Sequence, residues 1–148
     1  MKAVKDILVL CTGNSCRSQM AEGYLRHFAK HRANVYSAGI ETHGVNPLVV
    51  QVMEEDGIDI SNHTSNNVNE YIDIDFDLIL TVCNNAEESC PVFPSKALKF
   101  HYNFPDPAKK TGTEEEILNE FRAIRDQIKA YTEKFLKVHL YSNKAWFQ

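Results

Sequence analysis

The stretch ILVLCTGNSCRSQMAEG, residues 7–23, decides the fold of this chain. Its first four residues form a continuous apolar run of the kind that is buried in a parallel sheet, and the run stops at residues 12–14, Thr-Gly-Asn. From Ser18 onward, apolar residues recur at helical spacing and predict a helix with one buried stripe. The stripe consists of Met20, Ala21, Tyr24, Leu25, Phe28 and Ala29. The stretch therefore predicts a strand, a tight loop and a helix in direct succession.

The rest of the chain repeats this alternation. Residues 35–38 and 78–82 have strand patterns, and residues 96–104 have a weaker one. One helix is predicted after the cap Asn46 and closes at Gly57, and a long one begins at the capping box of Thr113 and Glu116. Strands that alternate with helices predict an α/β fold, because each parallel pair needs a crossover. We expect a three-layer α/β/α arrangement around a central, mostly parallel sheet.

Length and composition limit the protein classes. A chain of 148 residues with 43% hydrophobic and 24% charged content suits one domain with a single core. We assign residues 1–140 to this domain and residues 141–148 to a C-terminal tail of unknown role, and we expect a monomer. The formal net charge of -4 argues against a protein that binds nucleic acid or an anionic membrane, since both demand a basic face.

The N-terminus predicts the location. Its apolar run, residues 7–10, is far too short for a signal peptide or a membrane span, so we expect a cytoplasmic protein. Four cysteines in a reducing compartment are more often reactive, metal-bound or buried than joined in a permanent disulfide framework.

The loop between the first strand and the first helix has the features of an oxyanion site. Unpaired amides and the helix dipole at a helix N-terminus favour a tetrahedral anion, and five residues between Cys11 and Arg17 let the backbone wrap one. Gly13 and Asn14 tolerate the left-handed backbone that such a wrap needs. Arg17 supplies a planar cationic fork. The expected oxyanion-binding residues are Thr12, Gly13, Asn14, Ser15, Cys16 and Arg17.

The same surroundings activate Cys11. Amides and Arg17 should depress the pKa of its thiol into the reactive range of about 3.5–7.5, and the Ser18 hydroxyl can donate to the sulfur. In the alternative interpretation Cys11 is a buried core cysteine and Arg17 a surface charge. The succession of strand, loop and helix favours an anion-binding site instead. A nucleotide P-loop is excluded, since its Gly-Lys-Ser ending is absent.

Residues 11–23, CTGNSCRSQMAEG, resemble the active-site loop of the low-molecular-weight tyrosine phosphatases and their arsenate-reductase relatives. The resemblance extends through residues 36–40, residues 57–61, the region of Cys83 and Asp106-Pro107, and it covers roughly residues 5 to 135. It implies the phosphatase fold, with Cys11 as nucleophile.

Asp106 is the candidate general acid for ester hydrolysis. It lies in the proline-stiffened segment Phe104-Pro105-Asp106-Pro107, where the resemblance also places the acid. A plain turn aspartate before proline is the alternative. A tyrosine phosphatase working through a phosphocysteine is the rival function, weakened by Ala108-Lys109 where phosphatases usually offer an aromatic wall.

Reduction of arsenate to arsenite takes two electrons and therefore a second thiol. Cys83 ends a strand beside the first and can face the same pocket as Cys11, and Cys90 follows after the polar residues 84–89. The triad of Cys11, Cys83 and Cys90 resembles that of the thioredoxin-coupled arsenate reductases. That resemblance implies an adduct of Cys11 with arsenic, a disulfide cascade ending at Cys83-Cys90, and electrons from thioredoxin.

Metal chemistry is the alternative of a different class. A zinc or thiol-switch module would use the four cysteines, but their spacings fit structural zinc poorly. We expect no required cofactor. The resemblance also implies a potassium site at Asn14, Glu22, Ser37 and Asn66, and the asparagine at the last position, where relatives carry an aspartate, puts the site in question.

Overall fold

The computed structural model describes residues 4–84 and 91–141. Its strands are β1 (Lys5–Cys11), β2 (Ala33–Gly39), β3 (Leu78–Thr81) and β4 (Leu98–His101), and its α-helices are α1 (Arg17–Ala29), α2 (Pro47–Glu55) and α3 (Glu114–Leu136). Shorter helical turns are η1 (Lys30–Arg32), η2 (Val68–Tyr71), η3 (Pro107–Lys109) and the π-type turn η4 (Lys137–Tyr141).

The four strands form one parallel sheet in the order β2-β1-β3-β4. The central strand β1 pairs with β2 on one side and with β3 on the other, so Leu10 lies between Ala38 and Thr81. Its burial on both faces explains the uninterrupted apolar run of residues 7–10. The predicted parallel α/β sheet is confirmed.

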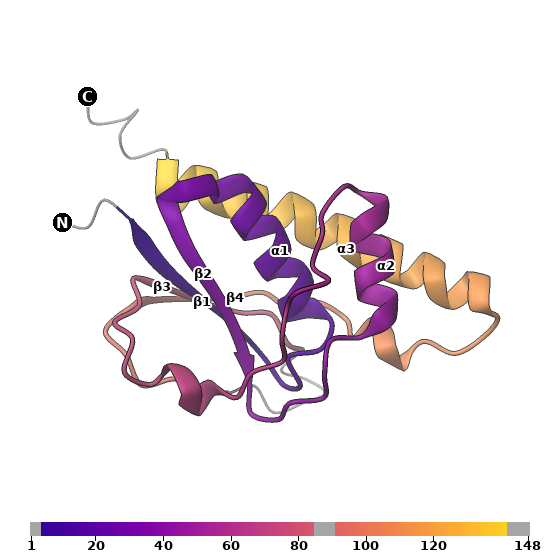
Figure 1. Ribbon diagram of the computed structural model, residues 1–148, viewed down its shortest axis with the longest axis horizontal. Coiled ribbons are helices and arrows are strands. Elements are labelled where there is room, and N and C mark those ends of the chain that lie inside the picture. Colours follow the sequence, from indigo (N-terminus) through magenta and orange to yellow (C-terminus); the bar gives the residue numbers. More distant parts are fainter. Residues whose placement is uncertain (1–3, 85–90, 142–148) are drawn as a thin grey trace.

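The two faces of the sheet are covered differently. Ile7, Val9 and Leu80 pack with all three α-helices, which lie together on one side in Figure 1. Leu8, Leu10 and Ile79 face the other way, toward Phe76, Phe93 and the segment that carries η2. This second cover is built from connections and a short turn instead of an α-helix. The connection from β2 to β3 crosses back over β1, and a right-handed crossover places its later part, which carries η2, on the face opposite α1.

Local signals set the helix ends. The Asn46 side chain accepts a hydrogen bond from the amide of Leu48 at 2.8 Å, and Gly57 has φ +77 just beyond α2. Thr113 and Glu116 form the predicted capping box of α3. In α1 the predicted stripe is buried except for Phe28, which is half-buried.

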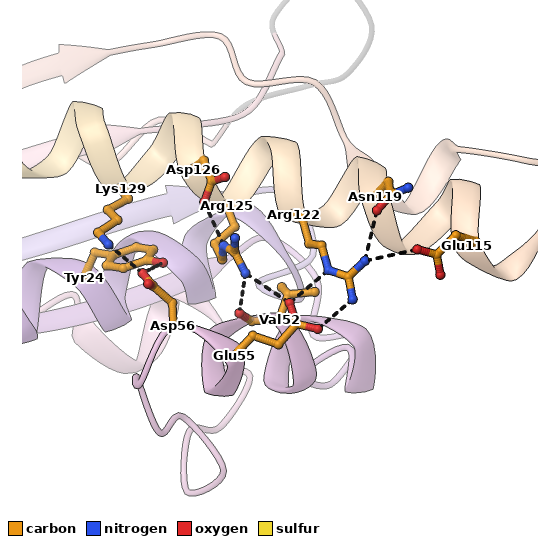
Figure 2. A network of polar contacts seen from close by, with 10 residues as sticks. All are labelled: Tyr24, Val52, Glu55, Asp56, Glu115, Asn119, Arg122, Arg125, Asp126 and Lys129. Atoms are coloured by element: carbon orange, nitrogen blue, oxygen red, sulfur yellow. Dashed lines mark hydrogen bonds and ion pairs between the residues drawn. The ribbon is translucent and has the colours of Figure 1, made fainter.

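A polar network holds α2 against α3 (Figure 2). Arg122 forms a two-pronged ion pair with Glu55, with its Nη2 2.8 Å from Oε2, and Arg125 donates to the carbonyl oxygen of Val52 at 2.9 Å. Asp56, just after α2, accepts from Lys129 of α3 at 2.9 Å and from the buried hydroxyl of Tyr24 of α1 at 2.7 Å. These contacts link α1, α2 and α3 to one another on one face of the sheet. Within residues 4–84 and 91–141, no helix is both long and apolar enough to cross a membrane.

Candidate active site

The first loop is turned so that its carbonyl groups point away from the space that it encloses. Oxygens of all four residues 12–15 accept hydrogen bonds from outside the loop. The donors are the amides of Glu41, His43 and Asn46, at 3.0, 3.0 and 3.1 Å from the oxygens of Thr12, Gly13 and Ser15, and Nε2 of Gln19, 3.1 Å from the oxygen of Asn14. Every peptide bond in the described part of the chain is trans. Because a trans peptide points its N–H opposite to its C=O, the amides of residues 13–16 face inward.

Inward amides beside a helix N-terminus make a cradle for an anion. Cys11, the last residue of β1, and Arg17, the first residue of α1, close its two ends. The binding of an oxyanion by residues 12–17 stays a prediction.

Asn14 is the central residue of the loop. It is fully buried and has the left-handed φ of +48 that the sequence predicted. Its side-chain nitrogen donates to Ser18 Oγ at 2.8 Å and to Ser37 Oγ at 2.9 Å, and its side-chain oxygen accepts from the amide of Asn66 at 2.7 Å. These bonds stabilise a backbone conformation that is unfavourable for most residues. Ser18 keeps its own hydroxyl hydrogen as a donor, so its bond to the Cys11 sulfur stays a prediction.

The expectation of a left-handed Gly13 is wrong. Gly13 is absent from the positive-φ residues of the described chain, and Asn14 alone carries the turn within the loop. Gly13 lacks a side chain for a steric reason, since a Cβ there would lie 2.5 Å from Nδ1 of His43. Gly39, at the end of β2, is more tightly constrained, because a Cβ there would lie 2.5 Å from the carbonyl oxygen of Thr12 and 2.9 Å from the amide of Asn14.

Arg17 is tied to the segment that carries the candidate acid. Its side chain is buried, and Nη1 donates to the carbonyl oxygen of Phe104 at 3.1 Å while Nη2 lies 3.8 Å from Oδ2 of Asp106. The other oxygen of Asp106 accepts from the amide of Ala108 at 3.0 Å and caps η3. Asp106 is thus both a turn residue and a carboxylate at the rim of the loop.

Three cysteines belong to one buried cluster, namely Cys11, Cys16 and Cys83. Neither Cys11 nor Cys16 is in a disulfide bond. Burial raises the pKa of Cys16 to about 11, so this thiol stays protonated at neutral pH. Cys83 follows β3, whose extension is held beside β1 by the bond from the amide of Val82 to the carbonyl oxygen of Leu10 at 3.0 Å.

Cys83 is fully buried and disulfide-bonded, and neither Cys11 nor Cys16 is its partner. Cys90 lies outside the described residues.

Sequence reasoning missed two residues that shape the loop. Gln19 is fully buried, and its Nε2 also donates to the carbonyl oxygen of Thr64 at 3.0 Å. Its position next to Met20 in the buried stripe was a signal, since a polar side chain at the buried start of a helix needs partners. The Phe104 carbonyl oxygen left no signal, because any residue type provides a carbonyl.

Nothing in the described residues supports a zinc module. No group of three or more His, Cys, Asp or Glu side chains within residues 4–84 and 91–141 is placed to hold a metal ion.

Comparison with known proteins agrees with this geometry. Residues 6–145 match the family model described as low molecular weight phosphotyrosine protein phosphatase. The chain belongs to this family. It is 50% identical over 131 residues to arsenate reductase 1 of Staphylococcus epidermidis, covering 88% of this chain and 95% of that protein. It is 49% identical over 131 residues to an arsenate reductase of Staphylococcus aureus, with the same coverage.

Solved structures place the fold in the same family. An arsenate reductase in the phosphate binding state superposes with a TM-score of 0.76 at 30% identity, covering 90% of this chain and 97% of that one. A low molecular weight protein tyrosine phosphatase from T. tengcongensis superposes with a TM-score of 0.72 at 22% identity, covering 90% of this chain and 98% of that one. The fold is thus shared by both kinds of protein.

Proposed function

We propose that this chain reduces arsenate to arsenite, with Cys11 as nucleophile and thioredoxin as the source of electrons. The loop supplies inward amides and Arg17 for the oxyanion, as its outward carbonyls indicate. Relatives that are about 50% identical in sequence are named arsenate reductases. An arsenate reductase that is 30% identical is described in a phosphate binding state, which supports a substrate with the shape and charge of phosphate. The site residues of this proposal are Cys11, residues 12–18, Cys83, Cys90 and Asp106.

In the first step, the Cys11 sulfur attacks arsenic and a bond to one arsenate oxygen breaks. That oxygen leaves as water after protonation, and Asp106, 3.8 Å from Arg17 at the rim of the loop, is the candidate proton donor. The inward amides and the Arg17 guanidinium stabilise the charge on the remaining oxygens. The product is a thiol ester of arsenic(V) on Cys11.

In the second step, the Cys83 sulfur attacks the Cys11 sulfur. The sulfur–arsenic bond breaks and its electron pair stays on arsenic, so arsenic(V) becomes arsenic(III) and leaves as arsenite while a Cys11-Cys83 disulfide forms. The Cys90 sulfur then attacks Cys83, which restores the Cys11 thiol and leaves a Cys83-Cys90 disulfide. The dithiol of thioredoxin reduces this last disulfide by exchange.

The observation that favours reduction over hydrolysis is the disulfide bond at Cys83. Cys83 is disulfide-bonded, while Cys11 and Cys16 are not. In the proposed cycle, a Cys11 thiol beside a disulfide-bonded Cys83 is the state that follows the attack of Cys90 on Cys83 and precedes reduction by thioredoxin. A hydrolytic cycle has no step for a disulfide at Cys83. Because the cycle needs Cys11 as a free thiol, we also propose a reducing, cytoplasmic location.

Phosphatase activity on aryl phosphates is the second candidate function. It is favoured by the placement of Asp106 against Arg17, and it would use the same loop through a phosphocysteine.

One experiment compares the two functions. NADPH oxidation is followed with purified protein, thioredoxin and thioredoxin reductase, with and without arsenate, beside hydrolysis of an aryl phosphate. Arsenate-dependent NADPH oxidation that exceeds aryl phosphate turnover supports the reductase. Aryl phosphate turnover without arsenate-dependent oxidation supports the phosphatase.

A further inference from the structure

The four residues implied as a potassium site do meet, but the structure joins them by direct hydrogen bonds. Ser37 Oγ donates to Glu22 Oε1 at 2.6 Å and accepts from Asn14 Nδ2 at 2.9 Å. Asn66 reaches Asn14 through its backbone amide, while its side chain turns outward, with Oδ1 accepting from Thr64 and Nδ2 donating to Glu70. The side-chain oxygen of Asn66 is therefore engaged elsewhere.

Glu22, the single carboxylate of this set, is already paired with the side chain of Arg26. Nε of Arg26, one helical turn further along α1, donates to Glu22 Oε2 at 2.9 Å. Nη2 of the same guanidinium donates to the carbonyl oxygen of Val35 on β2 at 2.6 Å, which ties the helix to the sheet although the Arg26 side chain is 54% exposed. The Glu22 side chain is 9% exposed, so its charge is largely withdrawn from water and needs this partner.

The neighbouring cavity also lacks the charge that would attract a cation. It measures about 270 Å³, and the basic residues Arg26 and His63 line it beside Glu22, its only Asp or Glu. His63 Nε2 lies 3.8 Å from Glu22 Oε2. One carboxylate that is already paired and two neighbouring bases give no net negative charge, so the residues present do not fit a potassium ion.

The network leads from Arg26 to the strained residue of the oxyanion loop. Arg26 orients the Glu22 carboxylate, Glu22 orients the Ser37 hydroxyl, and Ser37 accepts from the side chain of Asn14. Asn14 holds φ +48, and a residue in that conformation persists only when its surroundings stabilise it. Hydrogen bonds thus connect Arg26 to Asn14 through Glu22 and Ser37.

We propose that Arg26 is a positioning residue that takes the place of a potassium ion, so that this chain binds its oxyanion independently of potassium. The inference deepens the proposed function and rests on its oxyanion loop, but on neither Cys83 nor Cys90. It is tested by binding of inorganic phosphate, which requires no reduction. Failure of arsenate reduction would therefore be distinguishable from failure of this inference.

The test compares potassium chloride with sodium chloride at equal ionic strength, about 0.1 M. For the unaltered protein we expect the Kd for inorganic phosphate, measured by calorimetry, and the Tm to be the same in both salts. Arg26→Gln should raise the Kd for phosphate about tenfold in sodium chloride, because a misplaced loop loses several aligned amides at once. In potassium chloride this variant should recover part of the lost affinity. Arg26→Lys should bind like the unaltered protein.

Arg32→Gln is the matched control, because it removes a guanidinium from the neighbouring turn η1, outside this network. It should leave the Kd unchanged in both salts. A severalfold tighter Kd of the unaltered protein in potassium would overturn the proposal, and so would an Arg26→Gln variant that binds phosphate normally in sodium. If Arg26→Gln does not fold, the comparison of the two salts on the unaltered protein and on Arg26→Lys still tests the proposal.

Discussion

The guanidinium of Arg17 lies 3.8 Å from the carboxylate of Asp106, although the two residues are far apart in the chain. The link is reinforced by the bond from Arg17 to the carbonyl oxygen of Phe104. One arginine thus fixes the candidate acid relative to the oxyanion loop. This placement makes Asp106 testable as a proton donor.

We predict that Asp106→Asn slows aryl phosphate hydrolysis by roughly 10²–10⁴-fold, the usual contribution of a positioned acid. An amide keeps the shape and the cap of η3 but cannot give a proton to the leaving oxygen. The measurement is steady-state turnover, with the exposed Asp73→Asn as control. A change of only a few-fold would leave Asp106 as a turn residue.

Substitutions of Cys11 and Cys16 should differ sharply in their effect on activity. Cys11→Ser should abolish both arsenate reduction and aryl phosphate hydrolysis, because a hydroxyl cannot replace a thiolate as nucleophile. Cys16→Ala should keep both activities within about tenfold, because the buried Cys16 thiol, with its pKa of about 11, is protonated at neutral pH. Turnover retained by Cys11→Ser would remove Cys11 from the mechanism.

Much of this site could be predicted from the sequence because its signals are local. The run of residues 7–10, the left-handed Asn14 and the helix from residue 17 follow from neighbouring residue types. The outward bonding of the loop carbonyls could not be predicted, since three of its four donors are the backbone amides of Glu41, His43 and Asn46 in a distant segment, and any residue except proline provides such an amide. The role of Gly13 was misread for the same reason, because it depends on His43 from a distant segment.

Gly39→Ala should be far more damaging than Gly13→Ala. A methyl group at Gly39 meets the backbone of Thr12 and Asn14, which cannot move without disturbing the loop, and we expect a cost of about 1–3 kcal/mol and weaker phosphate binding. At Gly13 the three atoms nearest to the methyl belong to the exposed His43 ring, which can rotate. Urea unfolding and phosphate titration measure both effects, and equal losses in the two variants would contradict this account of the loop.

The hydrogen bonds that Asp56 accepts from Lys129 and Tyr24 should make the free energy of unfolding depend on pH. Hydrogen bonds from Lys129 and Tyr24 lower the pKa of Asp56 below its ordinary value of 3.8. A group whose pKa is lowered on folding adds stability above its ordinary pKa, and that stability is lost as the pH falls through the folded value. Asp56→Asn should therefore destabilise the protein at neutral pH, and the difference should shrink below about pH 4.

Tyr24→Phe is the companion variant, and it should cost about 1–2 kcal/mol at neutral pH through loss of the hydroxyl donor. Urea unfolding at several pH values checks both variants. A difference between Asp56→Asn and the unaltered protein that stays constant from neutral to acidic pH would rule out the link.

The central claim, that Cys11 and Cys83 pass two electrons to arsenic and that Cys90 then restores the Cys11 thiol, is tested most directly by peptide mapping of the Cys90→Ser variant after one exposure to arsenate without thioredoxin. Cys83 and Cys90 serve different steps of reduction and no step of ester hydrolysis, so Cys90→Ser and Cys83→Ser should both keep phosphatase activity. In Cys90→Ser, mass spectrometry should find Cys11 joined to Cys83 and one equivalent of arsenite, with no further turnover when thioredoxin is added. Cys83→Ser should give neither product. Unchanged thioredoxin-linked turnover in both variants, with no Cys11-Cys83 disulfide, would contradict the reductase mechanism.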